Sequence, residues 1–117
     1  MKYLMFVCWD AGRMDAQTEP EPSERAGDDE SFPWLDDVQA RGVWVTGDQL
    51  APPRRARTVR VRDGKTMVTD GPFAETKEAI GGFDILECES LEEAVAIAAA
   101  HPIAEMGTIE VRPLWGS

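Results

Sequence analysis

The chain of 117 residues is poor in basic side chains, because 12 Lys and Arg stand against 22 Asp and Glu, a formal net charge of −10. A strongly acidic protein is repelled by phosphate backbones and by anionic membrane surfaces. We therefore expect neither a nucleic acid nor a membrane as a partner. Long apolar runs are missing as well, since none approaches the roughly 20 residues that a membrane-spanning helix needs.

The N-terminal apolar run, Met1 to Trp9, has neither the length nor the cleavage site of a signal peptide. We therefore expect a soluble protein that stays in the cytoplasm. The length of the chain is typical of one domain and sufficient to enclose one core. The sequence predicts a single domain over residues 1–117.

Cysteine and histidine are scarce. Cys8 and Cys88 are the only cysteines, each lies in an apolar, strand-like run, and no CxxC spacing occurs. This pattern indicates two reduced core thiols. The alternative is a nucleophilic cysteine, which needs a neighbouring base, and the only histidine is His101. With one histidine and no cluster at ligand spacing, we predict no metal site and no cofactor.

Two segments are apolar at both odd and even positions. Lys2 to Trp9 reads KYLMFVCW, and Phe83 to Cys88 reads FDILEC, in which Asp84 stands among apolar neighbours. A strand exposed on one side alternates between apolar and polar residues, whereas a strand buried on both faces does not. Both segments are therefore predicted to be strands with two buried faces.

The other elements follow from local signals. Residues 10–31 are acidic, contain two prolines and have almost no large apolar side chains, so we expect a mobile surface loop. Its functional interpretation is a flap over a pocket, and the simpler one is a solvated insertion. A helix over about 29–41 and a strand over 43–48 follow. Strands over 58–62 and 65–69 are expected to form a tight hairpin.

Asp63-Gly64 tolerates the positive φ angles that such a hairpin turn requires. Val59 and Val61 alternate with Arg60 and Arg62, so one face of the hairpin is expected to be buried and the other solvated.

Ser90-Leu-Glu-Glu93 predicts a capping box at the start of a second helix, which Pro102 ends after His101. A last strand is expected over 108–112. The order of strand, helix, strand, hairpin, strand, helix and strand predicts an α+β fold. Two helices cover only one face of such a sheet, and an identical subunit is the simplest cover for the other face. The sequence therefore predicts a homodimer.

One motif resembles a known family. Residues 70–78 read DGPFAETKE and are followed by Gly81-Gly82-Phe83, and this stretch resembles the DGPF-domain branch of the YCII-related proteins. The resemblance continues in VRVRD (59–63), in GGFDILECESLEEA (81–94) and in TIEVRP (108–113), and covers nearly everything except residues 10–31.

The resemblance implies a ferredoxin-like sheet with two helices on one face, paired into a dimeric α/β barrel. It also implies a small-molecule enzyme or binding protein, and a link to sigma factors of the extracytoplasmic-function class. Some YCII-related proteins are proposed to use a His–Asp pair. Here the N-terminal half has no histidine, and His101-Pro102 stands where the family has its Asp-Pro, so that pair is not carried over.

Asp70 and His101 are the candidate catalytic residues. Asp70 is either a general base in a pocket or only the residue that closes the turn before Gly71-Pro72. His101 is the one side chain whose ordinary pKa lies near neutrality, although a histidine at a helix C-terminus is also favoured without catalysis.

Four further residues are candidate ligand-binding residues: Phe73, Glu75, Lys77 and Gly82. We expect Asp70, Phe73 and His101 to meet at one cleft between sheet and helices. For the charged residues, the simpler interpretation is a solvated turn with screened ion pairs. For Phe73 it is core packing.

Two functions remain open at this point. The first is that the protein binds a small organic molecule near the DGPF motif and, as an enzyme, also converts it. The second is a non-catalytic dimeric interaction module in transcriptional regulation, with a sigma factor as the partner that the family resemblance alone suggests.

Overall fold

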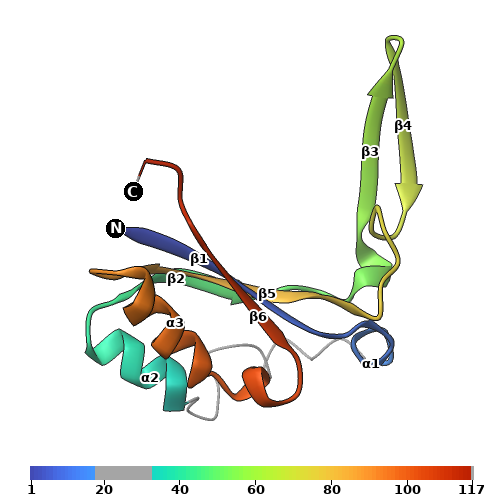
Figure 1. Cartoon of the computed structure of the whole chain (residues 1–117). Helices are drawn as coiled ribbons and strands as arrows, with labels where there is room; N and C mark the ends of the chain where they lie inside the picture. The colour runs from blue at the N-terminus through green and yellow to red at the C-terminus, as the bar shows by residue number, and fades with distance from the viewer. Residues whose placement is uncertain (18–32, 117) are drawn as a thin grey trace.

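The computed structural model describes residues 1–17 and 33–116, and its centre is an antiparallel sheet with the strand order β2-β5-β1-β6 (Figure 1). The strands are β2 (Trp44–Gln49), β5 (Glu78–Glu87), β1 (Lys2–Asp10) and β6 (Thr108–Pro113). β1 and β2 both pair antiparallel with β5, so they run parallel to each other with β5 between them. The helix α2 (Pro33–Ala40) connects them as a split βαβ unit.

A second such unit interleaves with the first, because β5 and β6 both pair antiparallel with β1 and the helix α3 (Leu91–Ala99) connects them. This topology confirms the predicted α+β class and is consistent with a ferredoxin-like fold. Within residues 1–17 and 33–116, the other helical elements are the short helices α1 (Ala11–Asp15), η2 (Pro53–Arg55) and η3 (Pro102–Glu105). None of the helices in the described ranges is long and apolar enough to cross a membrane.

The helices α2 and α3 lie on the same face of the sheet (Figure 1). Tyr3 and Met5 of β1 and Leu86 of β5 point toward them and are at most 1% exposed. The indole Nε1 of Trp34, in α2, donates a hydrogen bond of 2.8 Å to the carbonyl of Ile97, in α3. The two helices are therefore tied to each other as well as to the sheet, and the prediction of two helices on one face is confirmed.

The opposite face of the sheet is apolar at its centre. Leu4 lies across from Ile85, and Phe6 across from Phe83, and all four side chains are partly exposed. Among the residues that the structure describes, no element packs over them (Figure 1). We call this surface the open face. The two-faced apolar pattern of β1 and β5 is therefore present, but burial of the second face, which was also predicted, is not seen in the described chain, because these four side chains are partly exposed.

The second helix begins as a capping box, with one difference from expectation. Ser90 Oγ accepts a hydrogen bond of 3.1 Å from the backbone N–H of Glu93, and Glu93 Oε1 accepts one of 2.9 Å from Glu89. The Glu93 side chain therefore accepts from the backbone N–H of Glu89, the residue before the N-cap, and not from that of Ser90. Both bonds satisfy backbone donors near the helix start, as in the usual motif.

The strand predicted over 83–88 is too short, because β5 starts at Glu78. The ladder with β1 continues through Ile80 and Ala79, which lie across from Cys8 and Trp9, after a bulge next to Val7. Glycine at 81 permits this pairing, since a Cβ there would lie 2.6 Å from the indole nitrogen of Trp9. The end of the DGPFAETKE motif therefore lies in the sheet.

The predicted loop over 10–31 is wrong at its start. Asp10 ends β1, and its Oδ1 accepts a hydrogen bond of 2.8 Å from the backbone N–H of Arg13, which caps α1. Met14 is buried and anchors α1 against the sheet, since its Cε lies near Gly81. The rest of that prediction, and the start of the helix expected over 29–41, lie outside the described residues.

The hairpin forms a separate two-stranded sheet. β3 (Arg57–Arg62) and β4 (Lys65–Asp70) pair in register around Asp63 and Gly64, whose φ angles of 52° and 76° confirm the predicted tight turn. The hairpin projects from the end of the main sheet, on the side away from α2 and α3 (Figure 1). We call residues 57–70 the hairpin arm.

The expectation of one buried face on the arm is wrong for the described chain. Val59 and Val61 are 60% and 56% exposed, because nothing in the described chain packs against them. The alternation of valine and arginine gives the arm two chemically different faces. No element of the described chain packs against the valine face.

The core predicts a clear contrast between two leucines. Leu86→Ala removes a side chain that is 0% exposed, and we expect it to lower the free energy of unfolding by about 2–5 kcal/mol. Leu91→Ala is the matched control, because Leu91 is 43% exposed at the start of α3, and its loss is expected to stay below about 1 kcal/mol. Urea unfolding followed by circular dichroism measures both. Equal losses would contradict this placement of the core.

Candidate functional site

A groove of about 390 Å³ lies where the arm joins the body of the molecule. Its walls come from α1, η2 and the loop of residues 71–77, which we call the DGPF loop. The lining residues are Ala11, Asp15, Pro53, Arg54, Gly71, Pro72, Ala74, Glu75, Thr76 and Ala79. Small organic ligands occupy hollows of about this size, usually about 300–1,000 Å³. We call it the DGPF groove.

Arg54 fixes η2 against α1. Its guanidinium donates hydrogen bonds to the backbone carbonyls of Asp15 and Gln17, at 2.5 and 2.9 Å, and its backbone N–H donates one of 2.8 Å to Asp15 Oδ1. The DGPF loop is held on the other side by a backbone bond of 2.8 Å from Ala11 to Lys77. These bonds define two walls of the groove.

The root of the arm is held by three interactions. The backbone N–H of Gly71 donates to the carbonyl of Ala56 at 2.8 Å, and Thr58 Oγ1 donates to the carbonyl of Gly71 at the same distance. Arg57 Nε lies 3.1 Å from Asp70 Oδ1. Gly71 has a φ of +88°, a conformation that glycine adopts without strain.

The groove therefore combines proline and alanine surface with charged groups at its edge. Asp15 and Glu75 supply carboxylates, while Arg54 is already engaged with backbone carbonyls. Such a surface suits a ligand with an apolar part and hydrogen-bond donors.

Of the six predicted site residues, Glu75 lines the groove. Asp70, the last residue of β4, is exposed and forms its ion pair with Arg57 beside the groove. Phe73 is 80% exposed and is not part of the groove lining. Lys77 contributes its backbone carbonyl to the tie with α1, and Gly82 is buried in β5.

His101 lies in the helical layer. It is 7% exposed, its ring packs edge to face on Trp34 with centroids 4.8 Å apart, and its Nδ1 accepts a hydrogen bond of 3.0 Å from Ile103. Burial lowers the pKa of His101, which favours the neutral ring that this hydrogen bond requires. Neither His101 nor Asp70 lines the groove, and their catalytic roles stay predictions.

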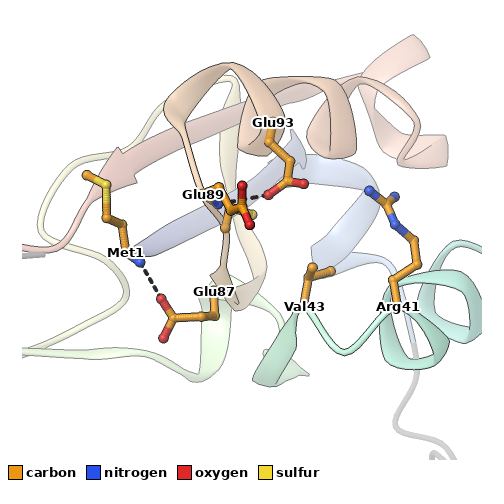
Figure 2. A pocket seen from close by; sticks show the side chains of 7 residues that line it. Met1, Arg41, Val43, Glu87, Glu89 and Glu93 are labelled. Carbon is orange, nitrogen blue, oxygen red and sulfur yellow. Dashed lines mark hydrogen bonds and ion pairs between the residues drawn. The ribbon is translucent and has the colours of Figure 1, made fainter.

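A second hollow, of about 590 Å³, lies at the other end of β5 (Figure 2). Its lining residues are Met1, Arg41, Val43, Glu87, Cys88, Glu89 and Glu93. Figure 2 shows the Met1 amino group paired with Glu87 and the Glu93 side chain bonded to Glu89. The Met1 ammonium lowers the pKa of Glu87.

Cys88 is the only thiol in that second hollow. Burial, followed by the neighbouring Glu93, raises its pKa to about 11. Burial also raises the pKa of Cys8, with Glu78 and Glu110 adding to the effect. Both thiols are therefore protonated at neutral pH, and the alternative of a nucleophilic cysteine is disfavoured. Both are free in the structure.

Asp84 is a perturbed group that the predicted site residues did not include. It lies on the helix-covered face, across from Met5 and Gly47, and Trp44 Nε1 donates a hydrogen bond of 2.9 Å to its Oδ1. Burial raises its pKa to about 6, against the lowering effect of the Trp44 bond. The signal was present in the sequence as the single carboxylate in FDILEC.

The described residues contain no group of three or more His, Cys, Asp or Glu side chains that could hold a metal ion.

Comparisons with known proteins place the chain in context. The family model described as "YCII-related domain" matches residues 1–116. An uncharacterized protein of Rhizobium meliloti (strain 1021) is 47% identical over 70 residues, which make up 56% of this chain and 55% of that protein. The chain thus spans about half the length of this curated relative.

Asp84 predicts a pH-dependent contribution to stability. Its pKa is raised on folding, so the fold is favoured at low pH and this contribution is lost as the pH rises through about 6. Asp84→Asn keeps an acceptor for Trp44 and removes the charge. We expect it to raise the free energy of unfolding at pH 7.5 by about 1–2 kcal/mol, after allowance for solvent screening.

The same substitution should give no such gain at pH 4, where the carboxyl of the folded protein is protonated. Asp48→Asn on the neighbouring strand is the control, because Asp48 is exposed. Urea unfolding at both pH values measures the effect. A gain from Asp84→Asn that is the same at pH 4 and pH 7.5 would contradict a raised pKa.

Proposed function

This chain belongs to the YCII-related family, and we propose that it binds a small organic molecule in the DGPF groove. The observation that carries this proposal is the groove itself, built by three segments that hydrogen bonds hold together. The DGPFAETKE motif also favours the DGPF branch of the family, and part of this motif forms a wall of the groove.

The chemistry of the groove suggests the class of ligand. The carboxylates of Asp15 and Glu75 favour amine, amide or hydroxyl donors, and the prolines at 53 and 72 favour an apolar part. If the bound molecule is also converted, Asp70 is the one of the two predicted catalytic residues that adjoins the groove wall in sequence, next to Gly71. His101 lies in the helical layer and does not line the groove, so the groove supports binding more directly than conversion.

Ligand binding is tested with a thermal-shift screen of small amines, amides and hydroxylated compounds. A ligand that binds only the folded protein raises the melting temperature. We expect Ala74→Trp to abolish the shift, because Ala74 lines the groove and the indole would fill it. Ala96→Trp on the exposed side of α3 is the matched control and should keep the shift.

Two outcomes would count against the groove. One is that no compound shifts the melting temperature of the wild type. The other is that Ala74→Trp and Ala96→Trp respond to a binding compound in the same way. Glu75→Gln should weaken binding of cationic amines more than that of neutral amides, since it removes one carboxylate from the rim.

The open face is the second part of the proposal. We infer that a second copy of the chain covers it, sheet against sheet, as in a dimeric α/β barrel. Leu4, Phe6, Phe83 and Ile85 give it an apolar centre of facing pairs. Exposed apolar patches of this kind are typical of subunit interfaces.

The dimer is tested by placing a charge on each side of the sheet. Phe83→Glu puts a carboxylate at the centre of the open face, and we expect it to weaken the dimer at least 100-fold, because a buried unpaired charge is costly. Val95→Glu is the control, since Val95 is 50% exposed on α3. Sedimentation equilibrium at micromolar concentration measures both. A wild type that remains monomeric would contradict the proposal.

A non-catalytic interaction module remains the second candidate function. The exposed apolar side chains of the hairpin arm favour it, because they offer a surface to another protein. The family resemblance makes a sigma factor the first partner to test. The measurement is whether a sigma factor co-purifies with this protein.

A further inference from the structure

Beyond the Arg57–Asp70 ion pair at its root, the hairpin arm carries apolar side chains on one face and mainly basic ones on the other. Val59 lies across from Val68, and Val61 across from Thr66, so these residues share a face. Arg60 lies across from Met67, and Arg62 across from Lys65, on the opposite face. Val68 is 58% exposed, similar to the two valines of β3.

The hairpin arm has an apolar face with no packing partner in the described chain. A two-stranded hairpin alone is marginally stable in water, and packing of its apolar face against another element is what stabilises it. The element order leaves the arm outside the main sheet, and the described residues supply no cover for its valines. The cover must therefore come from a surface that the described chain does not provide.

The direction of the arm selects the occupant. The arm rises on the side of the sheet away from α2 and α3, which is the side of the open face (Figure 1). A second copy seated on the open face therefore lies beside the arm.

Charge favours the same occupant. The arm holds four basic residues and only two of the chain's 22 acidic ones, Asp63 and Asp70, so the rest of the chain is strongly acidic. The net positive charge of the arm attracts it over long range to the acidic body of a second copy, while Arg60, Arg62 and Lys65 lie on the face opposite the valines and stay outside the apolar contact.

We propose that the hairpin arm docks onto a second copy of this chain through the face formed by Val59, Val61 and Val68. This inference rests on the sheet-to-sheet dimer proposed above and adds a second contact to it. In the dimer each copy extends one arm to the other, so that the contact is made twice by symmetry.

The docked arm also reaches the proposed ligand site. η2 and the DGPF loop are the two connections between the arm and the body, and both line the DGPF groove. Docking of the arm therefore restrains two walls of the groove, which makes the arm a positioning element for ligand binding in each copy.

The test changes the apolar face without changing strand propensity. Val59→Thr with Val68→Thr keeps two β-branched side chains in a facing pair and removes their apolar character. We expect the dissociation constant of the dimer, from sedimentation equilibrium, to rise at least tenfold. Met67→Thr is the matched control, because Met67 is 45% exposed on the opposite face, and it should leave the constant within twofold.

Hydrogen exchange of the wild type gives a second measurement that needs no substitution. Above the dissociation constant, amides of residues 57–70 are expected to exchange at least tenfold more slowly than in the diluted monomer. Unchanged exchange, or a dimer that the Val59→Thr and Val68→Thr variant does not weaken, overturns the proposal and leaves the arm to another partner such as a sigma factor.

The outcomes separate this proposal from the sheet interface. A dimer weakened by Phe83→Glu but not by the arm variant contradicts the arm contact alone. A dimer weakened by the arm variant but not by Phe83→Glu supports the arm and contradicts the sheet interface. A monomeric wild type overturns both.

Discussion

The rest of the structure depends on the two faces of β1, one of which packs against α2 and α3 while the other belongs to the open face. Tyr3 and Met5 are buried against α2 and α3, while Leu4 and Phe6, which alternate with them along the strand, lie on the opposite face and are partly exposed. A strand apolar on both faces requires two covers, and the two helices supply one. The open face, the proposed dimer and the position of the arm beside it all follow from this single constraint.

Much of the fold could be predicted because its signals are local. The two-faced pattern of residues 2–9 identifies the central strand, Ser90 and Glu93 mark the start of α3, and Asp63-Gly64 specifies the arm's turn. The extent of β5 could not be predicted from its own composition. Its first residues pair because Trp9 and Asp10 lie opposite them, which is a property of the partner strand.

The surroundings of the site residues were harder to predict than their secondary structure. Alternating Val and Arg in the arm predicts two different faces, but alternation does not reveal whether any element of the chain covers one of them. The groove is similarly non-local, since Asp15, Arg54 and Glu75 come from three separate segments. The sequence motif supplied only Glu75 and its neighbours, and nothing in the local pattern linked it to α1 or η2.

The central claim is that a second copy covers the open face, and Cys8 reports on that face directly. The irregularity beside Val7 skips Gly81 of β5, so β1 keeps its alternation and Cys8 shares the face of Leu4 and Phe6. Cys8 is partly exposed and free, whereas Cys88 is buried and serves as an internal reference. The decisive measurement is the rate of alkylation of each thiol at pH 9 as the protein concentration is raised. The account predicts that alkylation of Cys8 slows at least tenfold as the dimer forms, while that of Cys88 stays constant. A rate for Cys8 that is independent of concentration in a demonstrated dimer would show that the open face is not the interface.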